Sequence, residues 1–107
     1  MTEYIVVLIT APKEEEAVRI AGELVNDRLA GCVNIVKNIR SLYRWQGKTE
    51  DSAEVLMIAK TRLELFEPLL QRVKELHSYA VPEIVALPVI QGSSDYLSWL
   101  SEETGPQ

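Results

Sequence analysis

The sequence predicts an α+β fold in which two helices cover one face of a four-stranded antiparallel sheet. Short apolar, β-branched runs alternate with stretches whose apolar residues recur at helical spacing, in the order β-α-β-β-α-β. The two middle strands are long, and only the dipeptide Gln46-Gly47, which suits a tight turn, separates them. This order is the split βαβ, or ferredoxin-like, pattern, and a C-terminal helix follows it. At 107 residues the chain fits a single domain, residues 1–107.

The first strand and the first helix are predicted from the N-terminal quarter. Residues 4–10, YIVVLIT, form a continuous apolar run of the kind that a central strand requires. Pro12 suits a first helical turn, and the glutamates at 14–16 follow near the positive end of the helix dipole. Consecutive helical positions point around the axis, so these glutamates predict a solvated turn and no shared ion. The helix is expected to end near Asp27 or Arg28, after apolar residues at helical spacing: Ala17, Ile20, Ala21, Leu24 and Val25.

The central hairpin gives the strongest indication that the protein forms an oligomer. Residues 32–45 and 48–60 are predicted as its strands, the first interrupted near residues 37–38. About 13 residues at roughly 3.3 Å each span about 40 Å, whereas a 100-residue domain has a radius of gyration of only about 13 Å. The hairpin therefore overhangs its domain, and a symmetric oligomer is expected to cover its apolar side chains. A monomer with a shorter, bent hairpin is the alternative. The side chains concerned are Ile39, Leu42, Tyr43 and Trp45.

The second helix is expected after the hairpin. Thr61 with Glu64 matches a capping box, in which each side chain bonds to the other's backbone N–H. Pro68 predicts a kink or a late start, because proline in a helix interior removes a backbone hydrogen bond. The apolar positions at helical spacing are Phe66, Leu69, Leu70, Val73 and Leu76.

A strand and a short helix complete the predicted fold. Residues 83–90 predict a strand at a sheet edge or with a bulge, because Pro88 cannot donate to a ladder. The last helix carries Trp99, which we expect to anchor it to the body of the protein. Its start can be capped by Ser93, Ser94 or Asp95.

Composition narrows the classes of partner. The chain has 11 basic and 16 acidic residues, a net charge of −5, which argues against nucleic acid and anionic membranes, because both attract basic surfaces. Its one cysteine cannot form an internal disulfide, so a reducing compartment fits. The first ten residues lack the basic segment and the long apolar run of a signal peptide. We therefore expect a cytoplasmic protein.

Five segments give the chain a family resemblance. They are RLAGCVN (28–34), SLYRWQGKTE (41–50), Lys60-Thr61, HSYAVPEI (77–84) and YLSWL (96–100). In these segments, which cover nearly the whole sequence, the chain resembles the CutA family of divalent-cation tolerance proteins. The resemblance implies a ferredoxin-like fold, a tight homotrimer and a cytoplasmic role linked to copper and other divalent metal ions. It also implies architectural similarity to the trimeric PII signalling proteins, and it carries no catalytic activity.

Cys32 and His77 are the candidate metal ligands. Cys32 matches the cysteine of the RLAGCVN-type motif, and His77 matches the histidine that opens the H-x-Y-x-x-P-E stretch. Thiolate and imidazole suit copper or zinc. The ferredoxin-like order separates the two residues within one subunit, which predicts weak or inter-subunit binding of copper or another divalent ion. The chain departs from the family pattern at Ile9, Gly31 and Ser78, where some members have cysteine, alanine and proline.

Each candidate ligand also has a structural interpretation. A free cysteine is commonly a small buried hydrophobic residue. His77 ends the second helix, where an imidazolium stabilises the negative end of the dipole or the ring donates hydrogen bonds to a pocket. An enzyme finds no support, because neither residue has a catalytic partner beside it in the predicted fold.

A second set of residues mixes polar and aromatic chemistry: Trp45, Lys60, Tyr79 and Glu83. In trimers of the family that the chain resembles, clefts between subunits gather residues from these motifs. The functional interpretation is a pocket for a small molecule or an anion, with Lys60 as the cationic anchor and the two rings as walls. The alternative is interface packing with an inter-subunit salt bridge. A PII-like signalling module that binds a small ligand is therefore the runner-up to a metal-tolerance protein.

Overall fold

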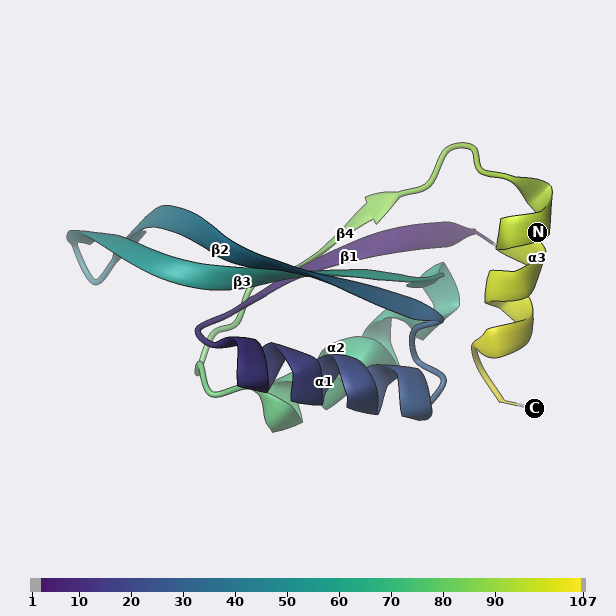
Figure 1. Ribbon diagram of the computed structural model, residues 1–107, viewed down its shortest axis with the longest axis horizontal. Helices are drawn as coiled ribbons and strands as arrows, with labels where there is room; N and C mark the ends of the chain where they lie inside the picture. Colours follow the sequence, from purple (N-terminus) through teal and green to yellow (C-terminus); the bar gives the residue numbers. More distant parts are fainter. Residues whose placement is uncertain (1–2, 107) are drawn as a thin grey trace.

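The computed structural model describes residues 3–106. The chain order is β-α-β-β-α-β-α, with a short 3-10 helix before the second α-helix (Figure 1). The elements are β1 (Tyr4–Ala11), α1 (Glu14–Asn26), β2 (Cys32–Trp45), β3 (Lys48–Arg62), η1 (Leu63–Leu65), α2 (Phe66–Leu76), β4 (Ile84–Pro88) and α3 (Ser94–Glu103).

The sheet has the topology that the sequence predicts. Its strands pair antiparallel in the order β2-β3-β1-β4. α1 and α2 lie together against one face, and α3 stands at the end of the sheet near the start of β1 (Figure 1). The ferredoxin-like α+β prediction is confirmed, and β4, whose last residue is Pro88, is an edge strand as expected.

Alternation along the strands gives the sheet a buried face and an open face. Ile5, Val7 and Ile9 of β1 belong to the core under the two helices. Among residues 3–106, only α3 reaches the opposite face, at the end that carries Tyr4 and Arg62. The rest of this face has no helix on it (Figure 1), and Val85 there is 45% exposed. One chain alone therefore leaves a row of aliphatic side chains in water. The strand register places on this open face Val6, Leu8, Leu56, Ile58, Val85 and Leu87.

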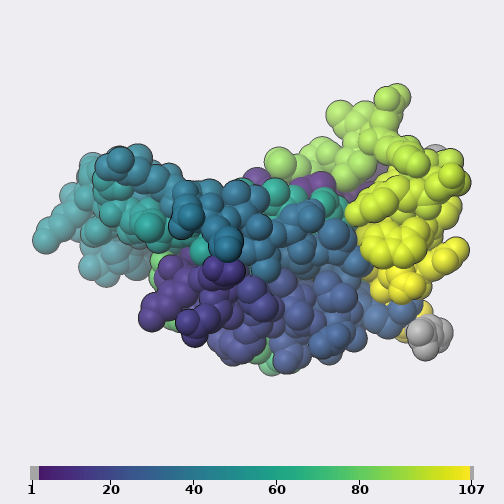
Figure 2. Space-filling view, in the orientation of Figure 1, coloured from purple at the N-terminus to yellow at the C-terminus, as the bar shows by residue number. Residues whose placement is uncertain are grey.

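The hairpin β2–β3 projects well beyond the helices (Figure 2). Gln46 and Gly47 at its tip both have positive φ, 50° and 80°, as a two-residue hairpin turn requires. The pairing is irregular between residues 36 and 39, where Asn38 has a φ of 61°, which confirms the predicted interruption. The hairpin makes the molecule 44 Å long against 25 and 22 Å in the other directions. Its exposed large side chains include Leu42, Tyr43 and Trp45.

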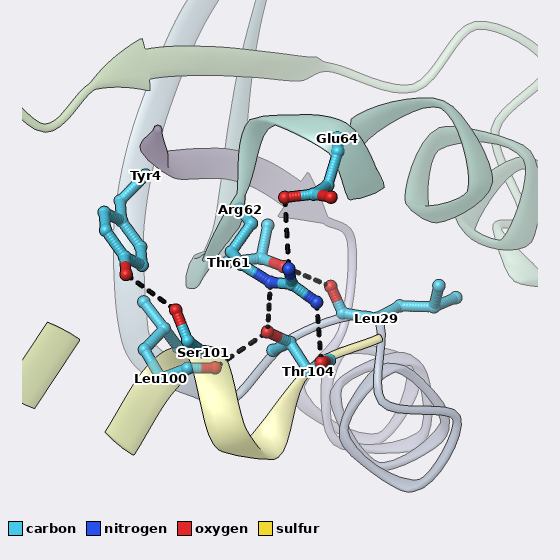
Figure 3. A network of polar contacts seen from close by, with 8 residues as sticks. All are labelled: Tyr4, Leu29, Thr61, Arg62, Glu64, Leu100, Ser101 and Thr104. Atoms are coloured by element: carbon cyan, nitrogen blue, oxygen red, sulfur yellow. Dashed lines mark hydrogen bonds and ion pairs between the residues drawn. The ribbon is translucent and has the colours of Figure 1, made fainter. Parts of the chain in front are cut away.

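The capping-box prediction for Thr61 and Glu64 is wrong. Thr61 lies within β3, and its fully buried hydroxyl donates to Leu29 O at 2.7 Å (Figure 3). Glu64 forms an ion pair with Arg62 at 3.1 Å. The tertiary contact with Leu29 thus replaces the local cap.

The prolines mark where two helices begin. The chain reaches α2 through η1, so Pro68 falls in the first turn of α2, where its missing N–H has no helical partner to lose. This confirms the predicted late start. α1 begins at Glu14 after an extended Lys13, so Pro12 precedes that helix instead of lying in its first turn. Ser93 occupies the N-cap position of α3 without a capping bond from its side chain.

Two arginines fasten the C-terminal segment to the body of the protein. Arg62 donates to Thr104 Oγ1 at 2.9 Å and to Thr104 O at 2.7 Å (Figure 3). Arg28 donates to Gly105 O at 2.6 Å and to Glu102 O at 2.7 Å. These bonds satisfy backbone carbonyls at the end of α3 and hold the helix at the edge of the sheet.

Replacing Arg62 by methionine is expected to lower the free energy of unfolding by about 1–3 kcal/mol, because buried Thr104 loses two hydrogen bonds at once. Methionine retains an aliphatic stem, so the loss reports mainly on those bonds. Urea unfolding at one fixed protein concentration measures it. Arg44→Met is the matched control, because exposed Arg44 makes a single 3.4 Å bond to Gly47 O. Equal losses in the two variants would contradict the assigned role.

Candidate functional site

A cavity of about 740 Å³ opens where the hairpin leaves the body of the sheet. Residues 40–43 and 45 of β2 form one wall, and residues 78–81 and 83, between α2 and β4, form another. The volume lies in the range of small-ligand sites. Three of the four residues predicted for a small-molecule pocket meet here, namely Trp45, Tyr79 and Glu83.

Glu54 of β3 is a buried carboxylate in this cavity, and only 6% of the residue is exposed. Its Oε2 accepts a hydrogen bond from the Tyr79 hydroxyl at 3.0 Å. No hydrogen bond from residues 3–106 reaches Oε1, which keeps some exposed surface. Burial, followed by the hydrogen bond and charge of Glu54, raises the pKa of Tyr79 to about 12. Tyr79 therefore stays protonated at neutral pH, and Glu54 offers a free oxygen to the cavity.

The charges of the lining do not balance. Two carboxylates, Glu54 and Glu83, face one guanidinium, Arg40. Arg40 already donates to both carboxylate oxygens of Asp51, at 2.9 and 2.6 Å. Both side chains of this pair are also solvent-exposed. The cavity therefore keeps an acidic character.

His77 does not line the cavity, but it contacts two residues that do, Thr10 and Tyr79. It is the C-cap of α2, and its side chain is completely buried. Nε2 lies 2.7 Å from Thr10 O, so this nitrogen carries the proton and donates, because a carbonyl oxygen can only accept. Nδ1 accepts the Tyr79 N–H at 3.0 Å. The ring thus joins the end of β1 to the segment that carries Tyr79, and both its nitrogens are engaged.

Glu16 of α1 holds the same segment. Its Oε2 accepts hydrogen bonds from Ser78 N–H and Ser78 Oγ–H, both at 3.0 Å, and lies 3.4 Å from His77 Nδ1. Burial alone would raise the pKa of Glu16, but the Ser78 bonds, followed by favourable electrostatic interactions with the His77 ring and Arg19, outweigh it and lower the pKa. The expected solvated turn is correct for the two preceding glutamates and wrong for Glu16, whose side chain is 13% exposed.

Glu16→Gln is expected to destabilise the protein at neutral pH and much less in acid. A carboxyl group with a depressed pKa stabilises the fold above its unfolded-state pKa, here 4.5, and loses that contribution as the pH falls through the folded-state pKa. Thermal unfolding of wild type and variant, followed from about pH 7 to about pH 3, should therefore show converging curves. Glu15→Gln changes an exposed position of the same turn and is the control. A deficit that does not change with pH would contradict the assigned role of the Glu16 charge.

Cys32 and Lys60 lie at the other end of the sheet. They are partners in the β2–β3 register, near the start of β1 and beside α3. Cys32 Sγ donates to Asn34 Oδ1 at 3.9 Å, and Lys60 Nζ donates to the same oxygen. Burial, followed by the charge and hydrogen bonding of Cys32, raises the pKa of Tyr96, which places the thiol beside this ring of α3.

Within one chain, therefore, the predicted site residues fall into two groups. His77, Trp45, Tyr79 and Glu83 gather around or behind the cavity, whereas Cys32 and Lys60 do not. The separation of Cys32 from His77 is the one expected from the topology. In the part of the chain that the structure describes, no three His, Cys, Asp or Glu side chains come together as metal ligands. A site that joins the two groups requires a second subunit.

Sequence reasoning missed Glu54 and Glu16. Glu54 faces away from the core in the alternation of β3, and nothing near it in the sequence indicates that Tyr79 covers it. The burial of Glu16 could have been predicted from the sequence, because Glu16 precedes buried Ile20 by four residues and so lies along the buried face of α1.

Comparisons with known proteins show the family and agree with the fold. A family model described as the CutA1 divalent ion tolerance protein matches residues 5–103. The divalent-cation tolerance protein CutA of Thermus thermophilus is 55% identical over 100 residues, which cover 94% of this chain and 97% of that protein. The chloroplastic protein CutA of Arabidopsis thaliana is 47% identical over 94% of this chain, which spans only 55% of that longer protein. The crystal structure of CutA1 from Oryza sativa superposes with a TM-score of 0.95 at 45% identity, covering 98% of this chain and 96% of that one.

Proposed function

Because the chain belongs to the CutA1 family of divalent-ion tolerance proteins, we propose that it is a cytoplasmic, non-catalytic homotrimer that binds copper and confers tolerance to divalent metal ions. The observation that carries this proposal is the high identity to the Thermus thermophilus protein over nearly the full length of both chains. That relative is named for divalent-cation tolerance, which supports the metal role.

The compartment is proposed from the chain's own residues. The name of the Arabidopsis thaliana relative places that protein in the chloroplast, so location varies among relatives. A single free cysteine supports a reducing compartment such as the cytoplasm. No helix among residues 3–106 is long and apolar enough to cross a membrane.

The trimer is proposed from the surface that one chain leaves uncovered. The open sheet face carries aliphatic side chains from β1, β3 and β4, and the hairpin adds exposed aromatic residues. Contiguous apolar surface of this kind favours association. Cyclic symmetry lets every copy cover the same face of its neighbour.

Copper binding is proposed to be weak and to involve more than one subunit. Cys32 is partly exposed at the end of the sheet and supplies a soft ligand. His77 would have to release Thr10 or Tyr79 before either nitrogen could bind a metal. Cys32 therefore ranks first, and the missing ligands must come from neighbouring copies or from solvent.

A growth experiment tests the physiological role. A bacterial strain that lacks its own CutA gene is complemented with the wild-type chain, with Cys32→Ala, or with Ser98→Ala at an exposed position of α3 as control. We expect the wild type and the control to raise the copper concentration that halves growth, and Cys32→Ala to raise it less. Identical growth of empty-vector and wild-type strains would contradict the tolerance role.

A PII-like signalling module is the second candidate function. The observation that favours it is the cavity, which already brings Trp45, Tyr79 and Glu83 together within one chain. In this proposal a small ligand in the cavity changes the state of the hairpin, which a partner protein then reads. Lys60 reaches such a site only from a neighbouring subunit.

A further inference from the structure

The cavity at the base of the hairpin has the chemistry of a cation site. We infer that it binds the ammonium group of an aliphatic amine, with Glu54 Oε1 as the anionic partner and the rings of Tyr43, Trp45 and Tyr79 as walls. This inference names the ligand class of the small-ligand function proposed above and rests on it.

The buried carboxylate is the first support. Glu54 is more than nine-tenths buried, yet Oε1 has no hydrogen-bond partner among residues 3–106. Oε1 keeps some exposed surface, so it is open to a ligand in the cavity, and an ammonium group there would supply both the charge and the donor. Arg40, the cation of the lining, is held by Asp51. Tyr79 fixes the other oxygen of Glu54, so the free oxygen is held in place before a ligand arrives.

The walls are the second support. Three aromatic side chains line the cavity, and two of them, Tyr43 and Trp45, are 39% and 47% exposed. Aromatic faces attract cations, and tryptophan does so most strongly. Leu42 and Val81 add aliphatic surface to the lining, which suits a hydrocarbon chain behind the ammonium group. An anion would instead meet two uncompensated carboxylates.

The ammonium group can come from a free amine or from a lysine side chain of a second copy of the chain. The chemistry is the same in both cases, and the experiment separates them. A free amine binds in a saturable way to the assembled protein. A lysine of a second copy excludes the amine and makes the assembly depend on Glu54.

The test uses Trp45 as a fluorescent reporter in the full-length Trp99→Phe protein, which leaves one tryptophan. The probe is butylammonium, with neutral butanol and anionic butyrate as controls of the same chain length. Glu54→Gln removes the charge and keeps an oxygen for Tyr79. Glu67→Gln, at an exposed position on α2, is the matched control. Thermal unfolding confirms that each variant is folded, and sedimentation reports the oligomeric state.

We expect butylammonium to bind in a saturable way. Glu54→Gln should weaken this binding about tenfold or more, and Glu67→Gln should leave it unchanged. If no amine binds and the Glu54→Gln assembly dissociates, the ammonium group comes from a lysine of a second copy. This outcome also supports the inference. Preferential binding of butyrate overturns the cationic ligand but keeps a small-ligand site. Absence of binding by all three probes, with an intact Glu54→Gln assembly, overturns the inference and removes the support for the signalling function.

Discussion

Val85→Asp is expected to dissociate the protein into single chains. Val85 lies on the open face beside Leu8 and is 45% exposed in one chain, so an aspartate there is solvated in the monomer. In a trimer that covers this face, each aspartate is desolvated without a partner, at a cost of about 2 kcal/mol or more per subunit. Sedimentation velocity should show the wild-type mass falling to one third.

Val18→Asp is the matched control for this prediction. Val18 is 52% exposed on α1, on the covered side of the sheet, and receives the same substitution. It should leave the assembly unchanged. Ile58→Asp, at the centre of the open face, is the second test and should act at least as strongly. Assemblies that survive both open-face substitutions would show that this face is not the subunit interface.

His77→Leu is expected to lower the free energy of unfolding by about 2–5 kcal/mol. Leucine fills much of the space but leaves Thr10 O and the Tyr79 N–H without partners in a buried position. His77→Gln should recover part of the loss, because its amide can donate to Thr10 O. Chemical unfolding, with circular dichroism as the signal, measures both variants.

The same pair of variants tests whether the His77 ring is structural or a metal ligand. If the ring is structural, copper uptake per folded subunit stays the same in His77→Gln. If the ring is a metal ligand, uptake falls while stability is largely kept. The buried ring with two engaged nitrogens predicts the first result.

Periodicity was enough to predict the elements and their order. The apolar run of β1, the helical spacing of α1 and α2, and the Gln46-Gly47 turn all act through neighbours in the sequence, and each proved correct to within a few residues. The ferredoxin-like topology then followed from short, antiparallel connections. The overhanging hairpin followed in turn from its length.

Contacts between residues far apart in the sequence could not be predicted from periodicity. The capping box failed because the Thr61 hydroxyl bonds to Leu29, 32 residues away. Glu54 becomes part of a cavity only because Tyr79 folds over it. Lys60 was grouped with Trp45, but the long strands carry the two to opposite ends of the molecule. In the proposed trimer, a neighbouring subunit would have to bring Lys60 to the cavity.

Native mass spectrometry of the reduced protein during a copper titration tests whether the chain forms a homotrimer that binds copper. We predict three chains of 12.1 kDa in one assembly that takes up a fixed number of copper ions and takes up fewer in Cys32→Ala. Zinc serves as the comparison metal, because it also accepts thiolate and imidazole ligands. A single-chain mass, or trimers with graded uptake that Cys32→Ala leaves unchanged, would contradict a homotrimer with a specific copper site.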